Sequence, residues 1–336
     1  MNLTDRINIL VKLGEALQHP DEKLTQLIKE SYRYNNWFTK KNYEQAIQKI
    51  ATQMLTRTAL EAWIANYQLP DRRIPETIGL VMAGNIPLVG FHDVVCTFVA
   101  GHRAQIKLSE KDKLVLPYLL GRMAATDSRV TEYFELTERL AGFDRVIATG
   151  SDNTARYFNA YFGKYPHIIR KNRNAVAILT GKEKTEELYE LGKDIFTYFG
   201  LGCRNVSKLF VPMDYPFKPL LEQLHEYREI IEHPKFKNNF DYNFTLLILN
   251  KIKYHSNGCL LIWENELLQS RIASLHFEYY KNEADLRQKL EKDHDQIQCV
   301  VSSQPVFEYQ HISFGKAQAP GLADYADGVD TLAFLA

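Results

Sequence analysis

The fold is decided by the stretch Thr77-Ile78-Gly79-Leu80-Val81-Met82-Ala83-Gly84-Asn85, a short apolar run that ends in a glycine turn. This pattern predicts a buried strand that meets a turn. A helix is expected from about 89 to 100, a second strand over 104–108 and a second helix over 113–125. A third strand is expected over 145–148. Strands alternating with helices of this length predict a parallel sheet with covered faces, and hence an α/β fold.

The regions on either side of this α/β segment have different patterns of apolar residues. Residues 1–70 show helical periodicity in their leucines. After Gly181, where we expect a domain boundary, the pattern predicts a long helix over 183–198, a two-glycine loop and a strand over 208–211. The remaining expected elements are helices at about 216–232 and 239–252, strands near 259–263, 272–280 and 297–302, and a final strand within 324–335.

Composition bounds the class of protein. A chain of 336 residues, 45% hydrophobic and 24% charged, is typical of a globular protein with room for two domains. Its 41 basic and 41 acidic residues argue against nucleic acid or an anionic membrane as the main partner. No apolar run reaches the roughly 18–20 residues that span a bilayer, so we expect no integral membrane contact.

The amino terminus and the cysteines bear on the compartment. Residues 1–6 lack the basic region and apolar core of a signal peptide. The cysteines lie far apart without a CxxC pair, which fits a reducing environment and gives no zinc pattern. They are Cys96, Cys203, Cys259 and Cys299. We therefore expect a cytoplasmic protein without a metal site.

Three turns end the predicted strands, where ligands of open α/β sheets bind. Asn85, in Gly84–Leu88, carries an amide that can donate to a developing oxyanion, although asparagine is also a common turn or N-cap residue. Lys107 can hold a nucleotide ribose or phosphate, or be a solvated lysine. Thr149-Gly150-Ser151 exposes N–H groups that suit a pyrophosphate, although glycine is common at such turns.

A fourth motif carries a thiol. Phe199-Gly200-Leu201-Gly202-Cys203 joins a predicted helix to a strand, and its glycines let a ligand approach closely. Arg204 and Lys208 would favour the reactive thiolate. The preceding helix acts in the opposite direction, because the carboxyl end of its dipole disfavours an anion. Cys203 is a candidate nucleophile, and a buried cysteine that packs as a small hydrophobe is the alternative.

The order of the four motifs resembles that of the aldehyde dehydrogenase superfamily. Its corresponding turns look like WNFPL, KPSE, TGS and GQxC, and its Cys-x-x-x-Ser-Arg parallels Cys203-x-x-x-Ser207-Lys208. The resemblance covers roughly residues 77–212, with weaker likeness at Phe277–Asn282 and Phe314–Lys316. It implies an aldehyde-dehydrogenase-like α/β fold with two Rossmann-type domains, one for the cofactor and one catalytic, after a helical amino-terminal segment.

The resemblance also implies an arrangement of domains. Residues 1–70 would form the helical segment, 71–181 the NAD(P)-binding domain and 182–310 the catalytic thiol domain. Residues 311–336 would return to the first domain or to another subunit. Superfamily resemblance further implies a homo-oligomer.

Site residues follow from the matching motifs. Cys203 would be the catalytic thiol, and Asn85 would stabilise the oxyanion together with the backbone N–H of Cys203. Residues implied to bind NAD or NADP are Lys107, Glu110, Thr149, Gly150 and Ser151. Glu266 is the candidate for binding the nicotinamide ribose.

One segment departs from the superfamily. Hydrolytic members carry Glu-Leu-Gly-Gly-Lys, whose glutamate activates water, whereas the matching region here contains Arg170-Lys171-Asn172-Arg173. Without that carboxylate, base-catalysed hydrolysis of an acyl-enzyme is not expected. The chain is more similar to the fatty acyl-CoA reductases related to the luminescence-system reductase, which residues 161–173 and 324–330 also resemble. This implies reduction of an acyl-CoA, or an acyl carrier protein thioester, to an aldehyde.

Two other classes stay open. One is a cysteine-dependent acyltransferase or thioesterase with His92 as base and Asp93 as its orienter, although adjacent helical residues point roughly 100° apart. The other is a non-catalytic paralogue that binds a partner through its final strand. The basic run 170–173 could hold CoA phosphates or be a structural strand.

Overall fold

The stretch around Gly79 forms β1 (Thr77–Val81) in the computed structural model, which describes residues 1–71 and 73–336. β1 is the middle strand of a five-stranded parallel sheet with the order β3-β2-β1-β4-β5. The other strands are β2 (Arg103–Lys107), β3 (Phe134–Leu136), β4 (Arg145–Thr149) and β5 (His167–Arg170). Leu80 of β1 lies in register with Ile106 and Ile147, and all three are buried. This is the strand order of a doubly wound sheet, and it reverses between β1 and β4.

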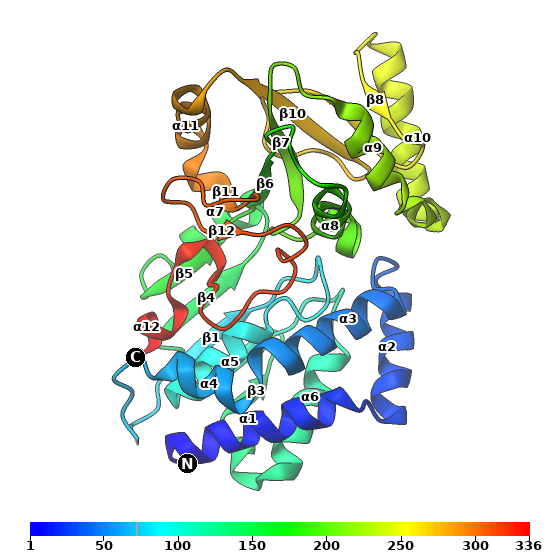
Figure 1. The fold of residues 1–336 in the computed structure, drawn as a ribbon. Helices are drawn as coiled ribbons and strands as arrows, with labels where there is room; N and C mark the ends of the chain where they lie inside the picture. The colour runs from blue at the N-terminus through cyan, green and yellow to red at the C-terminus, as the bar shows by residue number, and fades with distance from the viewer. Residues whose placement is uncertain (72) are drawn as a thin grey trace. The chain divides into compact units, whose positions relative to one another are not determined.

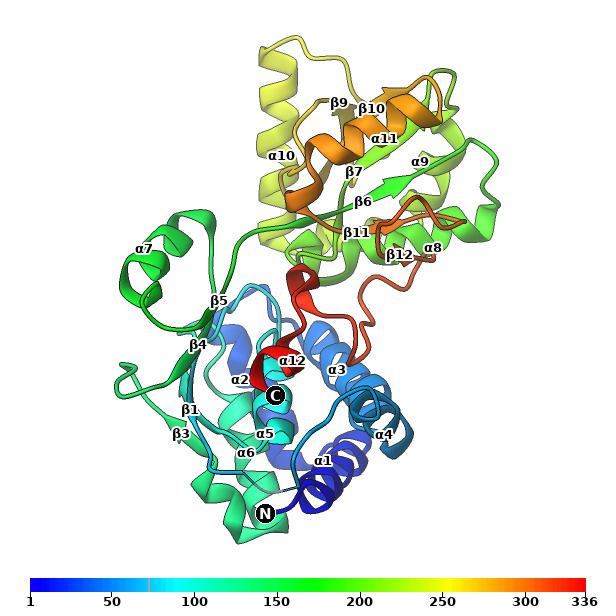
Figure 2. The same cartoon turned by 90° about the vertical axis from the view of Figure 1, so that its left-hand side faces the viewer.

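Helices cover both faces of this sheet. α5 (Phe91–Ala100) and α6 (Val115–Thr126) lie on one face and α7 (Asp152–Phe162) on the other (Figure 2). A 3-10 turn, Ser128–Glu132, leads from α6 into β3. The sequence therefore predicted β1, β2, β4 and the helices between them, and it missed the edge strand β3.

Four amino-terminal helices pack outside α5 and α6 (Figure 1). They are α1 (Leu3–Gln18), α2 (Glu22–Tyr34), α3 (Lys40–Lys49) and α4 (Arg57–Ile64), with a π-turn at Ile50–Met54. Leu10 and Leu17 are buried among them, as their helical spacing predicts. These helices form part of the same hydrophobic core as the sheet.

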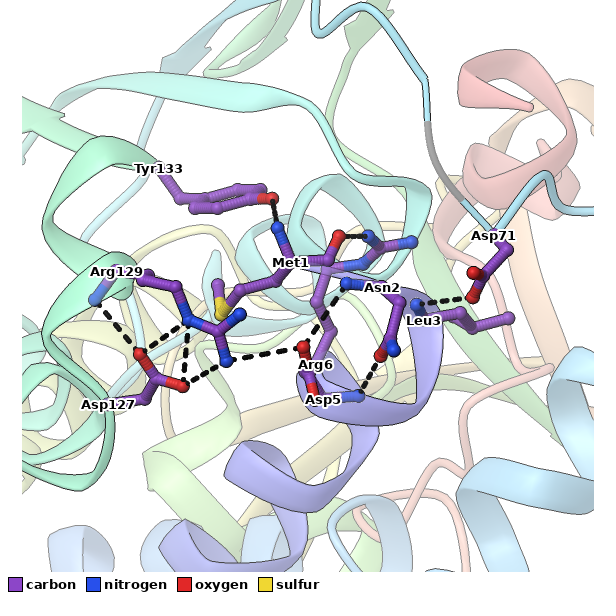
Figure 3. A network of polar contacts seen from close by, with 9 residues as sticks. All are labelled: Met1, Asn2, Leu3, Asp5, Arg6, Asp71, Asp127, Arg129 and Tyr133. Carbon is purple, nitrogen blue, oxygen red and sulfur yellow. Dashed lines mark hydrogen bonds and ion pairs between the residues drawn. The ribbon is translucent and has the colours of Figure 1, made fainter.

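A capping box starts α1 (Figure 3). The Asn2 side chain accepts a hydrogen bond from the Asp5 N–H (2.7 Å), and the Asp5 carboxylate accepts one from the Asn2 N–H (3.3 Å). The buried Arg6 guanidinium donates to the carbonyls of Met1 (2.9 Å) and Val99 (3.1 Å). These bonds fix the start of α1 against the end of α5.

A second sheet of seven strands lies in residues 173–319. Its order is β12-β11-β6-β7-β10-β9-β8, and only the pairing of β8 with β9 is antiparallel among the pairs described. The strands are β6 (Asn174–Ile178), β7 (Val206–Pro212), β8 (His255–Ser256), β9 (Leu261–Glu264), β10 (Ser274–Tyr280), β11 (Ile297–Val301) and β12 (His311–Ile312).

Helices also cover both faces of the second sheet. α11 (Glu283–Lys292) lies on one face, and α8 (Thr185–Phe196) and α9 (Phe217–His225) lie on the other (Figures 1 and 2). α10 (Pro234–Leu249) packs near β9. The 3-10 segments are Thr197–Gly200, Arg228–Glu232 and His294–Gln296. The expected α/β fold with two Rossmann-type sheets and a helical amino-terminal segment is confirmed.

The chain divides into two compact units. The first unit contains residues 1–172 and 320–336, and the second unit contains residues 173–319. The finer limits expected at 70, 181 and 310 stay predictions.

The last residues form a helix, so the expected final strand is wrong. A 3-10 turn at Ala326–Gly328 precedes α12 (Thr331–Leu335), which the Asp330 carboxylate caps by accepting from the Ala333 N–H (2.8 Å). Leu332 and Leu335 are fully buried in the core of the first unit. The run of apolar residues after an aspartate cap therefore packs as a short helix beside α5 (Figure 2).

Candidate active site

The Cys203 loop lies in the second unit between α8 and β7. α8 ends at Phe196, a single 3-10 turn follows, and β7 begins at Val206. Cys203 therefore stands at the amino end of its strand. The rule that ligands bind beyond the carboxyl ends of strands describes the turns of the first unit, but it does not describe Cys203.

Exposure separates Cys203 from the other thiols. Cys203 is partly exposed, whereas Cys96, Cys259 and Cys299 are buried. Burial raises the pKa of the Cys259 thiol to about 11 and raises the pKa of the Cys96 thiol as well. A high pKa and burial both make a thiol inert. Cys203 is thus the best candidate nucleophile among the four.

The backbone before Cys203 is strained. Tyr198, Phe199 and Gly200 have φ values of +55°, +58° and +77°, in the left-handed region. Bulky residues rarely adopt this conformation, which costs roughly 1–3 kcal/mol per residue. Packing compensates, because Tyr198 is buried and the Phe199 ring lies 4.4 Å from that of His233 between centroids. Held strain of this kind is concentrated at functional sites.

Asn205 ties the loop to the end of α8. Its Oδ1 accepts from the Gly202 N–H (2.8 Å), and its Nδ2 donates to the carbonyls of Asp194 (2.9 Å) and Thr197 (2.9 Å). The Asn205 N–H donates to the Gly202 carbonyl at 3.0 Å. Cys203 thus lies inside a loop that is closed on both sides.

Lys208 was expected to favour the Cys203 thiolate, but its position in the sheet argues against this role. Lys208 is 1% exposed on β7, and its Nζ donates to the Glu278 carboxylate (2.6 Å) and the Glu266 carbonyl (2.6 Å). Side chains of a strand alternate between the two faces of the sheet, and that of Lys208 lies on the face where Glu278 of β10 stands. The Glu278 carboxylate therefore neutralises the charge of Lys208 within the sheet. Arg204 is also buried.

Asn85 lies at the tip of the β1–α5 turn in the first unit. The turn is held at both ends, because Asn35 Nδ2 donates to the Gly84 carbonyl (3.3 Å) and the Leu88 N–H donates to Asp112 Oδ2 (2.8 Å). Leu88 is left-handed, with φ +56°. The N-cap of α5 is Gly90, so the alternative of Asn85 as an N-cap is wrong. Asn85 remains exposed on a rigid turn.

Asp112 supports this turn from the next loop. It is 8% exposed, burial raises the pKa of its carboxyl, and it accepts from the Tyr43 hydroxyl as well as from the Leu88 N–H. Gly84 has no room for a side chain, because an added Cβ would overlap Ser109. The close approach of these two loops explains why glycine stands at position 84.

Lys107 and Glu110 lie on the β2 side of the same sheet. Lys107 is the last residue of β2 and is exposed. The Glu110 side chain is 88% exposed and pairs with Lys113 at 2.8 Å, a hydrogen bond that lowers the pKa of the Glu110 carboxyl. Lys107 is therefore open to a ligand, whereas Glu110 already has a cationic partner.

Thr149, Gly150 and Ser151 form the turn between β4 and α7. Ser151 is the N-cap of α7, and its Oγ accepts from the Thr154 N–H at 3.3 Å. A Cβ at Gly150 would come within 3.0 Å of Phe158 and Thr154, so glycine permits the close packing of helix on strand. The amino terminus of an 11-residue helix favours anions through its N–H groups and dipole.

The first unit therefore gathers six of the seven predicted site residues at one edge of its sheet. Asn85 follows β1 and Gly150 follows β4, the two neighbouring strands at which the strand order reverses. Lys107 ends β2, which pairs with β1 on the other side. Cys203 belongs to the second unit.

The expected His92–Asp93 pair does not form a base and its orienter. His92 Nε2 lies 2.9 Å from the Leu322 carbonyl, and its ring contacts the rings of Trp63 and Tyr325. Asp93 is buried and accepts two hydrogen bonds from Arg170 (2.5 and 2.8 Å). The two side chains are thus used separately, as their roughly 100° separation on a helix predicts.

Arg170 is not open to CoA phosphates. It is 6% exposed on β5, pairs with Asp93, and donates to the Thr331 hydroxyl at 2.8 Å. The nearby Arg173 donates to the Ile297 carbonyl (3.3 Å) in the second unit. Of this basic run, Lys171 is exposed.

Glu266 points to solvent in the second unit. Its side chain is 79% exposed and lies 3.3 Å from Lys292, while its carbonyl accepts from Lys208. A pocket of about 820 Å³, lined in part by Tyr215, Phe217 and Tyr279, lies past the carboxyl end of β7. It contains none of the predicted site residues.

Among residues 1–71 and 73–336, no cluster of three or more His, Cys, Asp or Glu side chains could hold a metal ion. Within the same residues, no helix has the length and apolar character needed to cross a membrane.

The fold is similar to that of solved aldehyde dehydrogenases. Aldehyde dehydrogenase 21 from Physcomitrella patens, in complex with the product succinate, aligns with a TM-score of 0.69 at 13% identity, over 98% of this chain and 82% of that one. An NAD-dependent aldehyde dehydrogenase from Sinorhizobium meliloti aligns with a TM-score of 0.66 at 12% identity, over 92% of this chain and 71% of that one. A mutant of aldehyde dehydrogenase C from Pseudomonas syringae, in complex with NAD+ and octanal, aligns with a TM-score of 0.63 at 12% identity. The alignment covers 92% of this chain and 74% of that one.

The TM-scores of these alignments show the fold, whereas identities of 12–13% carry no conclusion about the reaction. No protein-family model matches the chain, and no curated protein matches its sequence. The protein is thus an α/β protein with the aldehyde dehydrogenase fold.

Sequence reasoning missed three residues that shape the site. Asn205, Asp112 and Asp194 each fix a loop through hydrogen bonds to backbone groups. Asn205 offered a local signal, because it stands two residues after the thiol in a glycine loop. The partners of the two aspartates lie in other loops, so their sequence context carried none.

Proposed function

We propose that the protein is an NAD(P)H-dependent reductase that converts an acyl-CoA to an aldehyde through a thioester on Cys203. The observation that carries the proposal is the combination of a partly exposed thiol in a strained loop with a basic segment where hydrolytic relatives have a glutamate. Asp93 of α5, the carboxylate that pairs with Arg170 of that segment, is buried in this ion pair. An acyl-enzyme that lacks a water-activating base and is not hydrolysed must pass its acyl group to another thiol or be reduced, and we propose reduction.

Cys203 performs the covalent step. Its thiolate attacks the thioester carbonyl, and the C–S bond to CoA breaks as the bond to Cys203 forms, so that CoA leaves as a thiolate and takes up a proton. NAD(P)H, if held by the first unit near Gly150, Ser151 and Lys107, would supply the hydride for reduction of the acyl carbonyl. Collapse of the thiohemiacetal on Cys203 then breaks its C–S bond, which releases the aldehyde and regenerates the thiolate.

Asn85 would stabilise the developing oxyanion. Asn85 is exposed on a turn whose backbone is held by Asn35 and Asp112, so the turn that presents its amide is fixed before substrate binds. The Cys203 N–H is the expected second donor. Loss of one such donor typically lowers the rate about 10²–10³-fold.

The first unit would bind the dinucleotide. The residues fit this role, because the start of α7 at Gly150 and Ser151 suits a pyrophosphate and exposed Lys107 suits the adenosine ribose. Glu110 is a weaker candidate because Lys113 already pairs with it. The NAD+ and octanal complex of the Pseudomonas syringae protein supports both a nicotinamide cofactor and an aliphatic aldehyde product.

The experiment follows acyl-CoA-dependent oxidation of NADH and of NADPH at the nicotinamide absorbance, with a panel of acyl chain lengths. We expect Cys203→Ala to abolish turnover and Asn85→Ala to lower kcat about 10²–10³-fold. Cys259→Ala is the matched control, because this buried thiol lies in the same unit and should be dispensable for chemistry.

The other function classes give different results in this assay. CoA release without oxidation of the cofactor would indicate an acyltransferase or thioesterase, and it would overturn the proposal. No reaction with any acyl-CoA or acyl carrier protein thioester would indicate a non-catalytic paralogue. Light scattering would test the proposed homo-oligomer independently.

A further inference from the structure

We propose that Asn205 is a positioning residue that keeps Cys203 reactive by occupying the helix carbonyls that would otherwise face the thiolate. The catalytic meaning of this proposal rests on the proposed function. The effect on the thiol itself does not, because it can be measured without any substrate.

The carboxyl end of α8 is an unfavourable electrostatic environment for a Cys203 thiolate. Cys203 follows the carboxyl end of α8, where the last carbonyls have no partners within the helix and the dipole is negative. Such an environment raises the pKa of a thiol. Lys208 does not offset it, because its ammonium is bonded to Glu278.

Asn205 makes this environment less unfavourable through its amide. Nδ2 donates to the carbonyls of Asp194 and Thr197 (both 2.9 Å), with a longer contact to Ile195 (3.4 Å). These carbonyls belong to the last turn of α8 and to its C-cap. When a carbonyl oxygen accepts a hydrogen bond, the donor partly compensates its partial negative charge. The carbonyl therefore repels a nearby thiolate less.

The same side chain holds the strained segment. Asn205 bonds Thr197 just before the left-handed residues 198–200 and Gly202 just after them. The pair of bonds between Asn205 and Gly202 closes the loop around Cys203. One side chain that is 3% exposed therefore sets both the shape and the charge of the loop.

Only an amide meets these requirements at this position. Asparagine supplies one acceptor and a donor group with two hydrogens, as the contacts require. Aspartate would turn a charged acceptor toward the helix carbonyls, and alanine would leave the carbonyls and the Gly202 N–H unpaired.

The test is the rate of Cys203 alkylation by iodoacetamide as a function of pH in the full-length protein, with the modified site located by mass spectrometry. Asn205→Ala should move the midpoint of the pH profile upward by about one pH unit, which is a roughly tenfold slower reaction below the midpoint. Asn205→Asp should shift it further, and Asn205→Ser, which keeps one donor, should fall between alanine and the native protein.

Asn243→Ala is the matched control. Asn243 is also 3% exposed in the second unit and donates to the Ile272 carbonyl (2.9 Å), so its loss destabilises without touching the Cys203 loop. Its alkylation midpoint should equal that of the native protein. Circular dichroism selects the Asn205 variants that fold, and the milder serine variant serves if the others do not.

An unchanged midpoint in a folded Asn205 variant would overturn the inference. A shifted midpoint in a protein that reduces no acyl-CoA would support it while the proposed function failed. Reductase activity in the native protein together with an unshifted midpoint would support the proposed function and overturn this inference.

Discussion

Asp194 is a buried carboxyl that joins two distant segments of the second unit. It is fully buried at the end of α8 and accepts from the N–H groups of Gly315 (2.6 Å) and Ala317 (2.9 Å). Burial raises the pKa of its carboxyl from 3.8 to about 7, and the two backbone hydrogen bonds offset only part of this effect. Because Asn205 bonds the carbonyl of the same residue, Asp194 links the Gly315 segment to the Cys203 loop.

The raised pKa predicts how stability depends on pH. Between about pH 4 and pH 7 the folded protein keeps the Asp194 proton, which the unfolded chain releases. The contribution of this carboxyl is therefore fully present below about pH 4 and is lost as the pH rises through 7. Urea unfolding should show the stability of the native protein falling relative to Asp194→Asn, by on the order of 2–4 kcal/mol between pH 4 and pH 8.

The control for this prediction is Asp241→Asn, which removes a carboxylate that is 55% exposed on α10. Its stability difference from the native protein should stay within about 0.5 kcal/mol across the same range. A pH-independent difference for Asp194→Asn would contradict the assignment.

At the scale of elements, the two turns that follow β1 and β2 are packed against each other. Gly84→Ala should destabilise the first unit by about 1–3 kcal/mol, because the new Cβ would overlap Ser109. Ser109→Gly should restore part of this loss in the double variant, since it removes the overlapping atoms. Urea unfolding of the four proteins measures the coupling.

Gly121→Ala is the matched control, because this glycine lies in α6 with no atom within 4 Å of an added Cβ. It should be neutral or stabilise by up to about 1 kcal/mol. Additive effects of the changes at positions 84 and 109 would show that the two turns do not share this contact.

The elements also show what could be predicted from sequence. The strand around Leu80 and the helices after it follow from local apolar runs and turns, so they were predictable. β3 was missed because three residues with little burial carry no periodic signal. The left-handed run at Tyr198 was missed because aromatic residues do not favour positive φ, and tertiary packing overrides that preference.

The candidate site was predictable in its residues more than in their surroundings. Asn85, Lys107, Ser151 and Cys203 could be proposed as site residues because each stands at or beside the end of a predicted strand. The burial of Arg170 and Lys208 was not foreseen, because their partners Asp93 and Glu278 lie 77 and 70 residues away in the chain. A sequence pattern reports a charge, whereas the pairing of that charge depends on topology.

At the scale of the whole molecule, the carboxyl-terminal segment belongs to the core of the first unit. Leu335 is fully buried, and its carbonyl accepts from Arg73 Nη1 at 2.8 Å and lies 2.8 Å from His102 Nε2. Thr331 bonds Arg170, which connects α12 to β5 and, through Asp93, to α5. A segment bound in this way within one chain is part of the fold of that chain rather than an exchangeable arm.

This view predicts the effect of shortening Leu335. Leu335→Ala should destabilise the first unit by about 2–5 kcal/mol, because it leaves a cavity in a packed core. Calorimetry should show the loss at every protein concentration, since the contact is made within the chain. Val329→Ala, at a side chain that is 40% exposed, should change little. If the loss grew on dilution, the segment would instead be held by another subunit, as expected for an arm that mediates assembly.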